Sequence, residues 1–307
     1  MRNPREARFC SRMIWLLVAV ALLAAYQTVV VLMIRLGWRT PRVPHRRDPS
    51  AIGIAFETIR FGTAKGKSLH GWWIPAEAAG AALAPCLVLV HGWGRNVERM
   101  LPWIEMLHPA GYDLLAFDAR HHGSSDADDF ASMVKFSEDI RAAVDVAGQQ
   151  RGASQGQVGV LGLSVGGAAA IHAAAHDDRI AAVATVGAFA APSARVLLGR
   201  GWWLLAPGVP LAFRLAERRI GFRFRDAAPE RHIGRARARF LVIHGVDDVV
   251  IPASNARRLA AASASARAWV VSGRGHSDLH REPAMPATLI AFFGEALGGR
   301  TRRAASA

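Results

Sequence analysis

Cysteine is nearly absent from this sequence, and its scarcity excludes several classes of protein. Only Cys10 and Cys86 occur among the 307 residues. Two cysteines do not make the disulfide framework of a small secreted domain, and neither CxxC nor cysteine–histidine metal spacing occurs. We therefore predict no metal and no cofactor, and we expect Cys86 to be a small core residue.

Internal repeats and long polar stretches are also missing, which argues against a repeat protein and against a disordered chain. The apolar fraction is 51%, which is ample for a buried core. Once an N-terminal segment is set aside, the remaining length suits one large α/β domain.

Acidic residues are the minority, and the excess of basic ones is unevenly placed. The formal charge is +14: residues 1–50 carry +7, residues 190–240 carry +8, the C-terminal tail carries +3, and the rest of the chain carries −4. These cations flank an apolar run and fill one insertion, whereas a nucleic-acid binder would carry them on a recognition element. We predict a membrane surface and no nucleic acid as partner. General use of arginine as a solvated cation is the alternative.

Residues 13–34 form a run of 22 residues without a charge, preceded by a basic flank over residues 1–12. At about 1.5 Å per residue this run spans a bilayer core, and we predict a transmembrane anchor. A signal peptide cleaved after Ala24-Ala25 is the alternative, but the apolar run continues beyond that point. Both flanks are basic, so the orientation stays open. Residues 35–53, rich in arginine and proline, are predicted to form a linker near the headgroups.

Residues 54–297 alternate strand-length apolar runs with helical stretches. A hairpin is expected around residues 62–67, and near-continuous apolar runs predict strands buried on both faces. The predicted strands cover 86–92, 113–118, 157–164, 180–189, 238–245 and 267–273, and the predicted helices 97–109, 134–149, 166–175, 254–264 and 283–297. This order predicts an α/β fold with a mostly parallel sheet and helices on both faces.

Two segments interrupt or follow this pattern. Residues 190–236 are basic, aromatic and mostly helical, and they predict a short lid insertion that includes Trp202, Trp203, Leu204, Leu205 and Phe213. Residues 298–307 are predicted to be a basic C-terminal tail.

The strongest motif is Gly162-Leu163-Ser164-Val165-Gly166, which lies between a predicted strand and an alanine-rich helix. So sharp a turn strains the central residue and needs small neighbours, and it exposes the hydroxyl of Ser164 above the sheet. The following helix N-terminus directs backbone N–H groups at developing negative charge.

In this setting the sequence resembles the α/β-hydrolase superfamily over residues 55–297. His91-Gly92-Trp93-Gly94 resembles the HG-x-G turn of the family, which implies the backbone N–H groups of Trp93 and Val165 as oxyanion donors. Residues 118–125 resemble the family's D-x-R-G-H-G-x-S loop, except that His121 replaces a glycine. The exchange questions the local turn and leaves the chemistry unaffected.

Two further stretches complete the resemblance. Residues 244–252 resemble the stretch that supplies the acid of the triad, which implies Asp248, with Asp247 as the alternative. Gly273-Arg274-Gly275-His276 resembles the family's G-x-G-H loop and implies His276 as the base. The order Ser, Asp, His is the order of this fold. A serine nucleophile also argues against dehalogenase or epoxide-hydrolase chemistry.

We therefore predict a membrane-anchored serine hydrolase of carboxylic-ester-hydrolase type that cleaves an ester or related acyl bond of a small or lipid-like substrate through an acyl-enzyme. An acyltransferase or peptidase with the same triad, or a non-catalytic membrane-associated binding protein, are the alternatives. The oligomeric state stays open.

The remaining histidines are expected to have other roles. His91 and His122 are predicted to brace loops, and surface or packing roles are predicted for His45, His70, His108, His172, His176, His232 and His280.

Overall fold

A computed structural model describes residues 4–37, 40–77, 84–151, 158–193, 203 and 207–304. The chain divides into two compact units, which are described separately. One comprises Met1–Arg39 with Ser193–Arg223, and the other comprises Thr40–Pro192 with Phe224–Ala307. Of the predicted lid residues, Trp202, Leu204 and Leu205 lie outside the described part of the chain.

The larger unit is built on an eight-stranded sheet in the order β1-β2-β4-β3-β5-β6-β7-β8. The strands are β1 (Glu57–Thr63), β2 (Lys67–Ile74), β3 (Cys86–Val90), β4 (Asp113–Phe117), β5 (Val158–Leu163), β6 (Ile180–Val186), β7 (Arg239–Gly245) and β8 (Ala266–Val271). Strands β1 and β2 form the predicted antiparallel hairpin, and all pairs from β4 to β8 are parallel. The fold class is confirmed.

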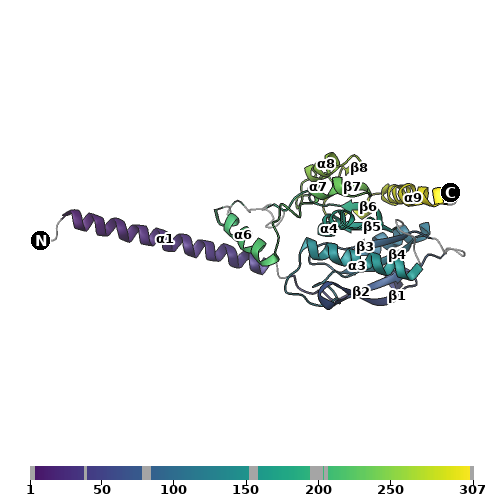
Figure 1. Ribbon diagram of the computed structural model, residues 1–307, viewed down its shortest axis with the longest axis horizontal. Coiled ribbons are helices and arrows are strands. Elements are labelled where there is room, and N and C mark those ends of the chain that lie inside the picture. The colour runs from purple at the N-terminus through teal and green to yellow at the C-terminus, as the bar shows by residue number, and fades with distance from the viewer. Residues whose placement is uncertain are drawn as a thin grey trace. The chain divides into compact units, whose positions relative to one another are not determined.

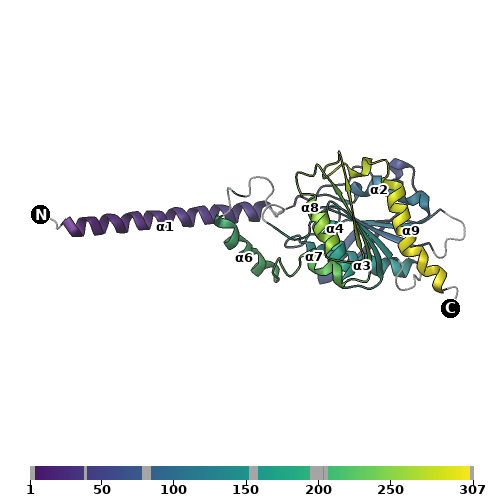
Figure 2. The ribbon, with the colours of Figure 1, turned by 90° about the horizontal axis from the view of Figure 1, so that it is seen from above.

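Helices cover both faces of this sheet, because its central strands are apolar on both faces. Every residue of β3, β4 and β6 is buried. Helix α2 (Leu101–Leu107) contacts α9 (Met285–Ala304), while α3 (Met133–Arg151), α4 (Val165–Ala174), α7 (Pro229–His232) and α8 (Ser254–Ala261) contact one another in series. Figure 2 shows α9 and α4 on opposite sides of the sheet. A large apolar core joins the strands to α2 and α9.

The strand order places the candidate site. Strand β3 lies between β4 and β5, so the chain leaves β3 toward one side of the sheet and later returns to the other. At such a switch point the loops that follow neighbouring strands diverge and leave a crevice at their carboxyl ends. The turn after β3 and the Ser164 turn after β5 therefore meet.

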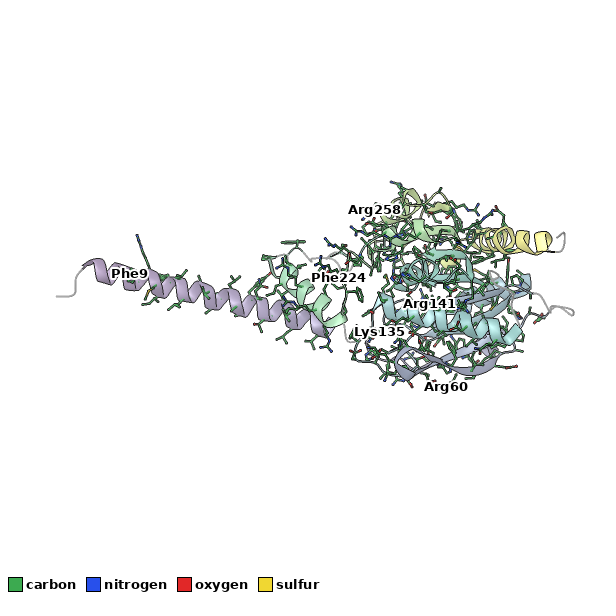
Figure 3. All side chains as sticks on the ribbon, in the orientation of Figure 1. Phe9, Arg60, Lys135, Arg141, Phe224 and Arg258 are labelled. Atoms are coloured by element: carbon green, nitrogen blue, oxygen red, sulfur yellow. The ribbon has the colours of Figure 1, made fainter. Side chains whose placement is uncertain are left out.

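The smaller unit contains α1 (Pro4–Gly37) and α6 (Val209–Ile220), labelled in Figure 1. Helix α1 contains one segment, Ser11–Leu32, that is long and apolar enough to cross a membrane, with a mean hydropathy of 2.3. Its side chains are largely exposed, among them Phe9, which is labelled on this helix in Figure 3. The helix is longer than the predicted span because the basic flank and the first linker residues continue it.

Helix α6 packs against the C-terminal half of α1. Val30 and Ala212 form a small buried cluster with Tyr26 and Val31. Gln27 Nε2 donates a hydrogen bond to the backbone oxygen of Pro207 over 3.3 Å. A Cβ at Gly208 would lie 2.8 Å from the methyl groups of Val30, so only glycine permits this approach.

The segment predicted as a linker near the headgroups makes specific contacts with the larger unit. Asn96 Nδ2 donates hydrogen bonds to the backbone oxygens of Val43 and Pro44, and the backbone N–H of Arg46 donates to Glu98 over 2.9 Å. Two bonds donated by Asn96 and one accepted by Glu98 hold this part of the chain in place. At the other end, α9 continues to Ala304, into the predicted tail.

Candidate active site

Ser164 lies in the single-residue turn between β5 and α4. Its φ of 52° and ψ of −117° fall outside the regions that residues with a Cβ normally occupy, and its backbone N–H donates to Val186 O over 2.8 Å. A Cβ at Gly162 would lie 2.5 Å from Gly166 O, and one at Gly166 would lie 2.4 Å from His91 O. Both glycines are therefore required by the close approach of the backbone around Ser164.

His276, in the loop after β8, meets the nucleophile. Its Nε2 lies 3.1 Å from Ser164 Oγ, and its Nδ1 lies 2.6 Å from Asp248 Oδ2. The carboxylate accepts from Nδ1–H, which leaves the lone pair of Nε2 directed at the hydroxyl. The structure thus brings together the three residues that the sequence predicts as a triad.

Of the two candidate carboxylates, that of Asp248 contacts His276, and the side chain of Asp247 is exposed. Asp248 Oδ1 accepts hydrogen bonds from the backbone N–H groups of Val250 and Ile251 over 2.9 and 2.8 Å. These two bonds fix the carboxylate plane and leave Oδ2 for the histidine.

A second histidine, His244, also contacts Asp248. Its Nε2 lies 3.1 Å from Asp248 Oδ2 and 2.8 Å from the backbone oxygen of Ile251. Burial alone would raise the pKa of Asp248, but hydrogen bonds from His244, His276 and the Ile251 backbone hold the pKa of this carboxyl well below its usual range. The carboxyl group of Asp248 is therefore ionised at neutral pH.

Gly187, which follows β6, is a neighbour of the triad that the sequence analysis missed. It has φ +67°, and a Cβ there would lie 3.1 Å from Nδ1 of His276. Its only sequence signal is its place after a buried strand, which many glycines share.

The turn after β3 lies beside the nucleophile. A Cβ at Gly92 would be 3.4 Å from the Cβ of Ser164, and Trp93 is the residue that follows Gly92 in the chain. Val165 is the first residue of α4. Both predicted oxyanion donors thus belong to segments that adjoin Ser164.

Two buried imidazoles brace this turn, as the sequence predicts. His122 accepts a hydrogen bond from the backbone N–H of Gly94 at Nε2 over 3.1 Å, and His91 Nε2 accepts from that of Ala119, also over 3.1 Å. Burial, together with the neighbouring His91, lowers the pKa of His122 to about 3, so its ring is neutral and able to accept.

The loop of residues 118–125 is organised by Asp118. Its Oδ1 accepts from the backbone N–H of Val97, and its Oδ2 accepts from that of Ser124 and from His45 Nε2, over 2.7, 2.8 and 2.7 Å. His121, at the position where the family has glycine, adopts φ 66°. This turn therefore contains a left-handed residue, and histidine adopts that backbone conformation less readily than glycine does.

Among the residues that the structure describes, two clusters of side chains have ligand atoms close enough to hold a metal ion, although none is predicted from the sequence. They are His172, His176 and His232, and His45, His70 and Asp118. Neither contains a member of the triad.

Comparisons with known proteins agree with this architecture. Residues 82–227 match the family model described as serine aminopeptidase, S33. A thiohydrolase of Aspergillus aculeatus is 33% identical over 134 residues, which are 43% of this chain and 41% of that protein. The chain thus matches about two fifths of the length of this relative.

Solved structures share the fold at low sequence identity. An esterase of Pyrococcus furiosus superposes with a TM-score of 0.66 at 18% identity, covering 84% of this chain and 99% of the esterase. A membrane phospholipase A, described as a bacterial virulence factor, superposes with a TM-score of 0.60 at 17% identity, covering 94% of this chain and 99% of that one. Sheet order and these likenesses show that the larger unit has the α/β-hydrolase fold.

Proposed function

We propose that this protein is a membrane-anchored serine hydrolase that cleaves esters or thioesters of apolar acyl groups. The observation that carries the proposal is the continuous contact from Ser164 Oγ to His276 Nε2 and from His276 Nδ1 to Asp248 Oδ2, over 3.1 and 2.6 Å. A non-catalytic binding protein would have no need of this alignment at a strained backbone turn.

The reaction follows from the geometry. His276 Nε2 takes the proton of Ser164 Oγ as Oγ attacks the carbonyl carbon, and the backbone N–H groups of Trp93 and Val165 stabilise the oxyanion. The bond to the leaving oxygen or sulfur then breaks, and the leaving group takes the proton from Nε2. Water then attacks the acyl carbon and gives its proton to His276 Nε2. The bond from that carbon to Ser164 Oγ breaks, Oγ takes the proton from Nε2, and the acid is released.

Asp248 stabilises the imidazolium that forms in each step. Because hydrogen bonds keep this carboxyl ionised, its negative charge is present before the proton arrives on His276. No proton has to move onto the acid.

Exposed apolar side chains support an apolar acyl group. Val246, Val249 and Val250 flank Asp248 and are exposed. In the smaller unit, Trp203 is 65% exposed and Leu211 43%. Large exposed apolar groups of this kind mark ligand or membrane contacts more often than single surface positions do.

The anchor rests on α1. Its apolar segment is 22 residues long, and only 6% of the most apolar window within it is buried in the structure, so the side chains require an apolar surrounding. The thiohydrolase relative favours a thioester among the possible bonds, and the membrane phospholipase favours a lipid-like acyl chain.

An active-site fluorophosphonate probe tests the nucleophile on the full chain in detergent. We expect covalent labelling of the wild type and none of Ser164→Ala. Equal labelling of both proteins, or none of the folded wild type, would contradict the proposal.

A series of ester, thioester and amide substrates of increasing acyl length tests the substrate class, with Ser164→Ala as the blank. We expect kcat/KM to rise with chain length and to be lowest for amides. Transfer of the acyl group to added alcohol or amine in preference to water would instead identify an acyltransferase.

A further inference from the structure

Three histidines from separate segments converge on the side of the sheet that carries α4. His172 lies in α4, His176 lies just beyond its end, and His232 ends α7. One ligand nitrogen of each ring lies within 4.8 Å of the others. The ring centroids of His172 lie 4.4 Å from those of both His176 and His232. The spacing of His172 and His176 places both on one face of the helical turn.

Each ring is held by a hydrogen bond at its other nitrogen. His176 Nδ1 donates to the backbone oxygen of His172 over 2.7 Å, and His232 Nε2 donates to that of Asp226 over 2.8 Å. These carbonyls fix both tautomers, because a carbonyl only accepts. The hydroxyl of Ser137, 2.9 Å from His172 Nδ1, is able to accept from the third ring.

The nitrogens left with lone pairs are then Nε2 of His172, Nε2 of His176 and Nδ1 of His232. Nδ1 of His232 is buried and has no hydrogen-bond partner among the described residues. A buried acceptor without a partner costs free energy unless a ligand satisfies it. Orientation of ligating histidines by carbonyl or hydroxyl partners is a common feature of metal sites.

We propose that His172, His176 and His232 bind a divalent transition-metal ion, with Zn²⁺ as the cation that this set fits. Three imidazole nitrogens suit Zn²⁺, whereas Ca²⁺ and Mg²⁺ require oxygen ligands. His176 is exposed, so water reaches the fourth coordination position. The nitrogens need to approach by about an ångström to reach a metal–nitrogen distance of about 2.0–2.1 Å.

The side chains around the three histidines influence the affinity that we expect for the metal ion. Burial lowers the pKa of His172 to about 3, with contributions from the two other rings and from Arg141, so this ring is neutral and available as a ligand. Arg141, labelled on α3 in Figure 3, and Arg235 near His232 are cations that oppose a dication. We therefore expect weaker binding than in sites that contain cysteine thiolates.

The second cluster, formed by His45, His70 and Asp118, is less suited to a metal ion. Both carboxylate oxygens of Asp118 already accept hydrogen bonds, from the backbone N–H groups of Val97 and Ser124 and from His45. A metal ion there would displace donors that organise the loop, so the proposal is confined to the cluster at His172.

The metal ion would have a structural role. His172 is eight residues beyond Ser164, or about 12 Å along the helix, which is too far for the ion to touch the reacting atoms. His232 lies near the C-terminal end of the predicted lid insertion. The ion would join this segment to the end of the helix that carries the nucleophile.

Zn²⁺ binding is measured by titration calorimetry on the full chain in detergent, purified with a tag free of histidine and stripped with a chelator. We expect one Zn²⁺ per chain and a higher midpoint of thermal unfolding at saturation. Co²⁺ as a second probe should give the visible absorption of a four-coordinate complex.

Two variants and one control assign the site. His176→Gln alters an exposed residue, and His232→Asn alters a buried one; each should weaken Zn²⁺ binding at least about tenfold and abolish the thermal shift. His280→Gln lies outside the cluster and should bind Zn²⁺ as the wild type does. Absence of saturable binding, or equal binding by His176→Gln and the wild type, would overturn the proposal.

Discussion

Gly187 lies against the imidazole of His276: a Cβ on this glycine would be 3.1 Å from Nδ1, the nitrogen that contacts Asp248. The backbone N–H of Gly187 donates to Ile243 O over 2.9 Å, so the glycine is fixed at the end of β6. The backbone of Gly187 therefore lies directly against the imidazole ring of His276.

Gly187→Ala should lower kcat by about 10- to 100-fold with a smaller change in KM, because the methyl group shifts the imidazole relative to Ser164. Initial rates on a chromogenic ester measure the effect. Gly273→Ala is the matched control, since Gly273 has φ +69° with no described heavy atom within 4 Å of its Cβ position. Equal losses in the two variants would mean that backbone strain, and not the collision, explains the effect.

Asp248→Asn should lower kcat by about 10⁴-fold while leaving the fold intact, because the amide favours the wrong tautomer of His276. Asp247→Asn should leave kcat unchanged, since its side chain is exposed. A larger loss in Asp247→Asn than in Asp248→Asn would assign the acid to the neighbouring residue.

His122→Ala should lower kcat by about 10- to 100-fold at nearly constant KM. Its loss leaves the backbone N–H of Gly94 without its acceptor, which loosens the turn that carries the Trp93 N–H. His108→Gln is a control matched for burial, because His108 instead contacts Pro75 O. If both variants lost stability equally and retained kcat, the bracing role would be refuted.

Asp118→Asn should lower the midpoint of thermal unfolding by roughly 2–10 °C near neutral pH. Burial would raise the pKa of Asp118, but the hydrogen bond from His45 and the proximity of His70 hold it below its usual range. The stability that its charge contributes is present above the unfolded pKa of about 3.9 and is lost as pH falls toward the folded value.

The difference between the wild type and Asp118→Asn should therefore shrink as the pH falls below about 4. Tryptophan fluorescence against temperature at several pH values measures it. Asp145→Asn, a change at an exposed carboxylate, should show no such trend. A difference that stays constant down to pH 2 would contradict the assignment to Asp118.

Much of the fold was predictable because a strand that is buried on both faces consists almost entirely of apolar residues. Strands such as β3 and β6 are buried on both faces, so their sequences are continuous apolar runs with definite limits. The serine turn was predictable for a related reason: at Gly162 and Gly166 any Cβ would meet backbone oxygen within 2.5 Å.

The remaining features depend on contacts between distant segments. His172 and His232 are 60 residues apart and come together only because α7 packs on α4. His45 donates to Asp118 from a segment that composition marks as an exposed linker. No local pattern records such pairs, and the spacing of His172 and His176 was the one available signal.

Because α6 packs on α1, the N-terminal helix also supports the insertion that contains α6. Gly208 approaches Val30 so closely that a tilt or rotation of α1 must carry α6 with it. In a bilayer, the thickness and composition of the lipid would then influence the insertion, even for a substrate dissolved in water. A truncated chain without α1 would expose the face of α6 that packs on α1. Kinetic constants measured on it would therefore not represent the full chain.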